Sequence, residues 1–218
     1  MTREELIKKI ALKMDEISSS DDVIVAVDSS DNNPLYAQIN GLLNESINDV
    51  LTKAPIFRIK DFVDLASSKQ IAEGYTFDKS RKVAHISVPD DFIRIVSIVD
   101  DAFQRPIVDL AIDGDDVSKR QHNKFLVAKT AKPVAVLGRD DAGDRVITCY
   151  SYELTDTPAP SMSYIKRFEG SKDLLSTIHI DAYLEDIITW VCAGRVFAAQ
   201  GDLNKGKICD DNAAALMI

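Results

Sequence analysis

Residues Gly201–Lys207, GDLNKGK, have the glycine and lysine spacing of a phosphate-binding loop, whose backbone amides surround the phosphates of a bound nucleotide. That chemistry also needs a Ser or Thr after the lysine to bind magnesium, and a strand before the loop. Ile208 follows the lysine here, and the preceding residues have the pattern of a helix. We therefore interpret this stretch as a loop that ends a helix, and we expect magnesium-ATP not to stabilise the protein.

Two aspartate-rich stretches resemble the start of calcium-binding loops. The first begins at Asp28 with oxygen ligands at alternate positions, but Asn33 and Ile39 stand where such a loop needs Gly and Glu. The second, Asp113–Asp116, has no later carboxylate at the required spacing. We expect both stretches to be solvated turns.

The histidines and cysteines are dispersed along the chain, at His85, His122, His179, Cys149, Cys192 and Cys209. None pairs with another at the spacing of zinc ligands, and three distant cysteines do not form a disulfide framework. Cys192 lies in an apolar helical stretch, where a thiol is usually a small buried side chain. We expect no catalytic, metal-binding or cofactor-binding residue.

Asp90 and Asp91 are adjacent carboxylates between two apolar runs, and paired carboxylates are a common acid–base device. Neighbouring residues of an extended chain point to opposite faces, which hinders the sharing of a proton. Proline fixes its own φ, and an Asp beside it accepts readily from a nearby amide. We therefore interpret Pro89, Asp90, Phe92 and Arg94 as a structural corner that opens a strand.

The 218-residue chain carries 35 acidic and 26 basic side chains, a formal net charge of −9. Such a surface repels phosphate, so binding the nucleic-acid backbone is not expected to be its main function, although DNA can pass along it. No apolar run approaches the roughly 20 residues needed to cross a bilayer. The charged, helical start, MTREELIKKI, is unlike a secretory signal. A soluble intracellular protein is expected.

Helical periodicity of apolar residues predicts three helices in the first third of the chain. Thr2 and Glu5 fit a capping box before the first helix, and Asn33-Pro34 suits the start of the second. The predicted helices span residues 3–17, 34–53 and 61–73. Residues 23–27 fit either a short strand or a turn.

From Tyr75 the apolar period changes to two, which is typical of strands. The clearest hairpin has its turn at Gly138–Asp144, which is rich in turn-forming residues. A polar loop is expected at 113–123, and strands at 75–78, 82–88, 92–99, 105–110, 124–128, 133–137, 145–152 and 161–167.

Asp181 is placed to cap a long helix, Ala182–Gln200, whose broad apolar face predicts substantial burial. Gly201 is expected to end it. The last six residues are apolar and have no polar face, which makes them costly to leave in water. We expect them to form an assembly interface: Ala213, Ala214, Ala215, Leu216, Met217 and Ile218.

These patterns together predict an α+β fold. N-terminal helices and a long C-terminal helix are expected to form a helical layer, with an antiparallel β-meander between them in the sequence. The expected parts are an N-terminal helical part (1–74), a β domain (75–167) and a C-terminal helix and tail (168–218) that complete the helical part.

Several short motifs follow one another in a distinctive order. The strand HISVPDDFIRIVSIV precedes Phe103 and Arg105-Pro106-Ile107, and then come KPVAVL, a polar hairpin and RVITCYSY. YIKR then precedes an acidic linker and the helix that ends in WVCAGRVFAAQGD. This order, from Leu35 to Gly201, resembles the head–tail adaptor proteins of short-tailed bacteriophages, including the ring proteins of crAss-like phages.

In that family a Leu-Pro corner with Asp, a hydrophobic residue and Arg opens a strand. Val88 stands here where Leu is common, and Pro89, Asp90, Phe92 and Arg94 keep the pattern. The glycine that is usual between NKF and KPVAVL is absent.

The resemblance implies a structural virion protein and no enzyme. It implies a homo-oligomeric ring, commonly a dodecamer, below the portal protein, which extends the DNA channel and docks downstream tail or ring proteins. DNA would pass through the lumen without sequence-specific binding, and no cofactor or membrane would be involved. The protein would reside in the tail or neck of the virion, and in the host cytoplasm during assembly.

Two alternatives remain open from the residues alone. One is an enzyme with a composite site formed by distant residues, and the other is a peripheral binding module of a virion or envelope. For a ring, the acidic excess predicts a lumen of negative or mixed sign. The loops Asp113–Asp116 and Asp140–Asp144 are expected to face that lumen or the outer rim.

Overall fold

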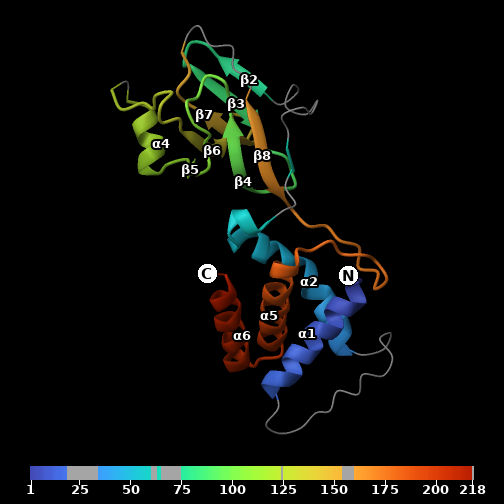
Figure 1. Cartoon of the computed structure of the whole chain (residues 1–218). Helices are drawn as coiled ribbons and strands as arrows, with labels where there is room; N and C mark the ends of the chain where they lie inside the picture. The colour runs from blue at the N-terminus through green and yellow to red at the C-terminus, as the bar shows by residue number, and fades with distance from the viewer. Residues whose placement is uncertain (19–33, 60–62, 65–74, 124, 154–159, 218) are drawn as a thin grey trace. The chain divides into compact units, whose positions relative to one another are not determined.

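The computed structural model describes residues 1–18, 34–59, 63–64, 75–123, 125–153 and 160–217, and its fold is α+β (Figure 1). The chain forms two compact units. A helical unit comprises Met1–Lys60 and Arg167–Ile218, and a β unit comprises Asp61–Lys166. Both ends of the chain therefore contribute to the helical unit, and the β unit is inserted between them.

Three helices pack against one another in the helical unit: α1 (Arg3–Ser18), α2 (Pro34–Lys53) and α5 (Ala182–Ala199). They bury aliphatic side chains at helical spacing, among them Leu6, Ile10, Ile39, Leu43, Ile187 and Val191. The helices predicted at 3–17, 34–53 and 182–200 are confirmed, and so is their packing together.

Two of these helices begin with the caps that the sequence indicates. Thr2 Oγ1 accepts from the Glu5 amide at 3.2 Å, and Glu5 Oε2 accepts from the Thr2 amide at 2.8 Å. The second bond lowers the pKa of Glu5. At the start of α5, the Asp181 carboxylate accepts from the Tyr183 amide at 3.1 Å. These bonds satisfy amides that a first helical turn leaves without partners.

A further helix, α6 (Leu203–Leu216), follows α5, although the sequence pattern predicts a loop and an apolar tail. Gly201 ends α5 with a φ of 88°, as expected. Gly194 and Gly206 let the two helices approach, because a Cβ on either would lie 3.2 Å from the carbonyl oxygen of the other. The prediction is wrong because α6 packs on α5 through small residues, Gly206, Cys209 and Ala213, and lacks a broad aliphatic stripe.

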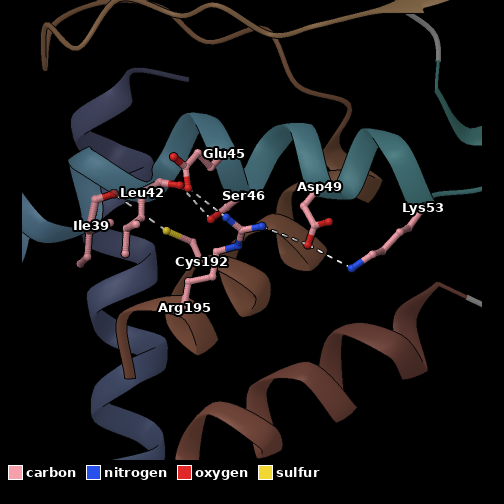
Figure 2. Close-up of polar contacts among 8 residues, drawn as sticks. All are labelled: Ile39, Leu42, Glu45, Ser46, Asp49, Lys53, Cys192 and Arg195. Atoms are coloured by element: carbon pink, nitrogen blue, oxygen red, sulfur yellow. Dashed lines mark hydrogen bonds and ion pairs between the residues drawn. The ribbon is translucent and has the colours of Figure 1, made fainter. Parts of the chain in front are cut away.

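Figure 2 shows the polar contacts between α2 and α5. Arg195 of α5 forms ion pairs with Glu45 at 3.2 Å and Asp49 at 3.3 Å, and Asp49 also pairs with Lys53 at 3.1 Å. Deeper in the same contact, the Cys192 thiol faces the Ile39 carbonyl oxygen at 3.9 Å. The charged pairs are partly exposed, so their contribution to stability is small compared with that of the buried aliphatic side chains.

A ladder of three asparagines on α2 binds residues 168–172, which we call the strap. Asn48 Nδ2 donates to the Phe168 carbonyl at 3.1 Å, and Asn48 Oδ1 accepts from the Phe168 amide at 2.7 Å. Asn44 Nδ2 donates to the Gly170 carbonyl at 2.8 Å, and Asn40 Nδ2 donates to the Lys172 carbonyl at 3.0 Å. Side chains spaced by four along the helix thus bind backbone groups spaced by two along the strap.

Arg3 of α1 completes this ladder and is fully buried. Its guanidinium donates to Asn40 Oδ1 at 2.5 Å, to Asn44 Oδ1 at 2.8 Å and to the Asn40 carbonyl at 3.0 Å. Desolvation lowers the pKa of Arg3, although the group remains charged at neutral pH. Each ladder asparagine near Arg3 therefore uses its oxygen for α1 and its amide for the strap.

The β unit contains two sheets. The three-stranded sheet is antiparallel, in the order β1 (Val63–Asp64), β8 (Ser161–Lys166) and β4 (Phe92–Val99). The five-stranded sheet has the order β2 (Tyr75–Asp78), β3 (Val83–Ser87), β7 (Arg145–Cys149), β6 (Ala135–Arg139) and β5 (Leu110–Ile112). One core joins both sheets, including Ile86 and Ile147 from the larger and Ile95, Met162 and Tyr164 from the smaller.

The connections differ from the expected meander. β3 pairs with β7, and β5 runs parallel to β6. Of the strand predicted at 105–110, Ile107 forms an isolated bridge with Ile98 and Leu110 begins β5, and Pro106 has no amide for a ladder. The structure places Val63 and Asp64 in strand β1, where the pattern predicts a helix over 61–73. The rest of that helix, residues 23–27, Asp28 and Asn33 lie outside the described residues.

Two further predictions fail between β5 and β6 because local hydrogen bonds compete with the expected structure. The predicted loop 113–123 contains helix α4 (Asp116–Gln121), and Asp115 caps it by accepting from the Ser118 amide at 2.7 Å. Residues 125–128 do not form a strand, since the amides of Phe125, Leu126 and Val127 all donate to oxygens of Asn123. Amides used in a turn are not available to a neighbouring strand.

Asn44→Leu should destabilise the helical unit by about 2–4 kcal/mol, because it leaves an Arg3 donor and the Gly170 carbonyl without partners. The single tryptophan, Trp190, lies on α5 beside Lys13 of α1, so its fluorescence during urea unfolding reports on this unit. Asn204→Ala, on the exposed side of α6, is the control and should leave the midpoint unchanged. Equal midpoints for both variants would refute a role for the ladder in stability.

Candidate assembly surfaces

The corner at Pro89 is a hydrogen-bonded turn. The Pro89 carbonyl accepts from the Phe92 amide at 3.1 Å and from the Arg145 guanidinium at 3.1 Å. Asp91 accepts from the Tyr164 hydroxyl at 2.8 Å, and the rings of Phe92 and Tyr164 lie 5.6 Å apart. The two carboxylates thus differ in role, since Asp91 ties β4 to β8 whereas Asp90 is exposed.

Burial also shifts the pKa values of two side chains near this corner, Tyr164 and Arg94. Burial is the main cause that raises the pKa of Tyr164, and the hydrogen bond to Asp91 raises it further. Arg94 is half-buried in β4, where desolvation lowers its pKa. Tyr164 is therefore a neutral donor at physiological pH, as a structural bond requires.

The acidic loops use several of their carboxylates in their own turns. Asp140 Oδ1 accepts from the amides of Ala142 and Asp144, both at 2.9 Å, which closes the hairpin turn. Asp113 Oδ1 accepts from the Ser118 hydroxyl at 3.0 Å, beside the cap that Asp115 provides. The exposed carboxylates of these loops remain available to set the sign of the surrounding field.

The thiols are all buried, and burial raises the pKa of each, to about 11 for Cys192 and Cys209. They are therefore protonated at neutral pH and are poor nucleophiles or metal ligands. His85 Nδ1 lies 3.0 Å from Thr148 Oγ1 across β3 and β7, and His122 and His179 are exposed. Within the described residues, no group of three or more His, Cys, Asp or Glu side chains is arranged to hold a metal ion.

The stretch that matches a phosphate-binding loop spans the junction between α5 and α6. Gly201 ends one helix, and Asp202 caps the next by accepting from the Lys205 amide at 3.0 Å. The Gly206 amide donates to the Asp202 carbonyl, also at 3.0 Å. The motif therefore extends into a helix rather than preceding one, and the amides of Lys205 and Gly206 are already bonded.

The predicted tail interface is divided by α6. Ala213 is buried, Ala214, Ala215 and Leu216 are exposed, and Met217 is half-buried. Ile218 lies outside the described residues. The Tyr183 hydroxyl donates to the Leu216 carbonyl, which fixes the end of the helix. Of the described members, Ala214, Ala215 and Leu216 are the ones most accessible to another molecule.

A more concentrated apolar surface lies in the β unit. Of the seven large hydrophobic side chains described as exposed in this unit, six lie between residues 108 and 127. The most prominent are Phe125, which is 82% exposed, and its neighbours Leu126 and Val127. We name residues 117–123 and 125–132 the arm, which comprises most of α4 and the turn after it, beside strand β5 (Figure 1).

Local hydrogen bonds hold the arm in one conformation. The Asn123 carbonyl accepts from the amides of Leu126 and Val127, both at 2.9 Å. The Gln121 side chain spans the turn, donating to the Val117 carbonyl and accepting from the Ala128 amide, both at 2.9 Å. The apolar side chains are thus presented outward by an ordered backbone, and this preorganisation lowers the entropic cost of binding.

Cations flank this apolar cluster in the sequence. Residues 117–139 contain six Lys or Arg and no Asp or Glu. Arg120, Lys129 and Lys132 are exposed and make no ion pair with any residue that the structure describes. The sequence contains this signal as basic residues on both sides of FLV, but the short apolar run KFLVA itself favours a strand and conceals it.

A scan of the sequence against models of protein families found no match, and neither did a search among curated proteins. Of the described helices, none is long and apolar enough to span a membrane.

Asp91→Ala should weaken the β4–β8 contact by about 1–2 kcal/mol, because the buried Tyr164 hydroxyl loses its acceptor. Hydrogen–deuterium exchange of β8 amides should be faster in this variant. Asp90→Ala is the matched control, and its exchange should equal that of the unmodified protein. Faster exchange in the Asp90 variant alone would contradict this assignment.

Ala213→Leu should lower the stability of the helical unit by about 1–3 kcal/mol, because Ala213 is buried and a larger side chain there would overpack its surroundings. Ala215→Leu, two residues away on the exposed side, should change stability by less than about 0.5 kcal/mol. Urea unfolding followed by Trp190 fluorescence distinguishes the two. Similar destabilisation in both variants would mean that Ala215 is also a packing residue.

Proposed function

We propose that this protein is a structural subunit of a bacteriophage virion, a head–tail adaptor that forms a ring below the portal. The observation that carries the proposal is the arm, an ordered turn that directs Phe125, Leu126 and Val127 into solvent. Exposed apolar clusters with ordered backbones are typical of surfaces that bind other proteins. The order of motifs from Leu35 to Gly201, which resembles the adaptor family, supports the same function.

The chemistry of the described side chains also favours a structural role. The carboxylate that marks the corner, Asp91, is bonded to Tyr164, and the thiols have raised pKa values that disfavour nucleophilic catalysis. In the stretch that resembles a nucleotide site, Gly201 forms a turn, Asp202 caps α6 and Gly206 contacts α5. These features support an adaptor over an enzyme with a composite site.

The net charge of −9 suits a ring through which DNA must move. A basic lumen would hold the duplex by releasing counterions, whereas an acidic or mixed lumen would repel it. Salt limits such a field to about 8 Å at physiological ionic strength, so only residues close to the duplex affect its passage. The proposal therefore places a surface of negative or mixed sign around the channel.

The mass of the purified protein, measured by native mass spectrometry alone and with portal protein, tests this function. A closed oligomer of one size, formed alone or on the portal, is expected. Binding to the portal or capsid without ring closure would instead identify a peripheral module. A protein that stays monomeric and binds neither would refute the adaptor. In an assembled ring, a lumen lined mainly by Lys and Arg would overturn the charge argument and indicate a DNA clamp.

A further inference from the structure

We propose that the arm of one copy binds the acidic segment at residues 15–31 of a second copy. This inference rests on the proposed function and specifies the contact between subunits. Residues 15–31 contain six Asp or Glu and no Lys or Arg, and the apolar run VIVAV lies among them. Acidic groups that flank an apolar run in the sequence complement the arm, where basic groups flank an apolar cluster.

The arm offers both kinds of contact. Its exposed cations, Arg120, Lys129 and Lys132, have no ion-pair partner among the described residues, whereas Lys119 lies 3.9 Å from Asp116. Phe125 and Leu126 lie between these cations in the sequence and are 82% and 58% exposed. An apolar centre with a charged rim is the usual anatomy of a protein interface.

The acidic segment begins in the described part of the helical unit. Asp15 and Glu16 are exposed in the last turn of α1, where no basic side chain balances the negative end of the helix dipole. Glu16 pairs with Lys13 at 3.1 Å, but the chain has no other Lys or Arg from residue 14 to residue 52. This stretch therefore carries excess negative charge that residues near it in the sequence do not balance.

Charge favours a contact between two different surfaces over a contact between two identical ones. Two arms facing each other would bring Lys129 and Lys132 of both copies together, and two acidic segments would repel in the same way. A contact between unlike surfaces is heterologous, and heterologous contacts generate rings when the rotation between copies closes. Duplex DNA also attracts cations, but phosphates do not cover apolar side chains such as Phe125 and Leu126.

Charge reversal on each side tests the contact. The arm variant is Lys129→Glu with Lys132→Glu, and the acidic-segment variant is Asp21→Lys with Asp22→Lys. Each should weaken self-association by about tenfold or more in analytical ultracentrifugation. Lys79→Glu with Arg81→Glu, in the exposed β2–β3 turn, is the matched control and should assemble normally. Trp190 fluorescence and circular dichroism should show that every variant is folded.

Mixing the two variants distinguishes a second copy from the same chain. In the mixture each reversed arm meets a reversed acidic segment only on another copy, so assembly should be restored. If all four substitutions in one chain restore assembly but the mixture does not, the arm binds the acidic segment of its own chain and the proposal is wrong. It is also wrong if the arm variant loses binding to duplex DNA while its self-association is unchanged.

A separate pair of variants tests the apolar side chains of the arm. Phe125→Ser should weaken self-association by about tenfold, whereas Phe57→Ser, at an equally exposed phenylalanine of the helical unit, should not. If the unmodified protein assembles and every variant assembles equally well, this contact is wrong and the adaptor function stands. If the unmodified protein neither self-associates nor binds the portal, the adaptor function itself fails.

Discussion

The helical unit depends on the hydrogen bonds between the asparagines of α2 and the strap. Four residues of a helix rise about 6 Å, and two residues of an extended chain span about 6.6 Å, so the two spacings nearly match. Asn48, Asn44 and Asn40 can therefore each bond one carbonyl group at alternate residues of the strap, Phe168, Gly170 and Lys172. Because they bind the backbone, these contacts fix the path of the chain after β8 largely independently of its side chains. Gly170 is an exception, since a Cβ there would lie 2.4 Å from the Phe168 ring.

Arg3 shows why this network must be complete. A buried guanidinium is costly unless its donors are satisfied, and here all three interactions are with neutral oxygens of α2. The adjoining amides of Arg3 and Glu4 donate to the carbonyls of Ser176 and Leu174, at 2.9 and 3.0 Å. The segment after the strap thus satisfies the first amides of α1. The helical unit must bring together residues separated by more than a hundred positions before these bonds can form, which slows folding.

The elements that the sequence predicts are those with long, regular apolar patterns. α1, α2, α5 and the eight-residue strand β4 bury residues at a clear period, so tertiary packing and local preference agree. The asparagine ladder escapes prediction because Asn at a spacing of four resembles a solvated helix face. The only signal is that Asn is an unfavourable residue within a helix. The pattern does not predict α6 because Gly206 and Ala213 are small residues that let the helices approach closely but bury little apolar area. It does not predict α4 because a helix of six residues is too short to show a period.

The arm illustrates a different limit, since its composition predicts one structure and its hydrogen bonds impose another. KFLVA is a short apolar run with strand-forming residues, yet the oxygens of Asn123 take the amides that a strand would need. The result is an exposed apolar cluster, flanked in the sequence by cations on a chain of opposite net charge. Residues 14–52, in the other unit, carry eight Asp or Glu and no Lys or Arg, so this stretch could balance the cations of the arm. Since screening confines their attraction to about 8 Å, these charges favour binding only where the two surfaces meet, and the apolar side chains add affinity at that contact.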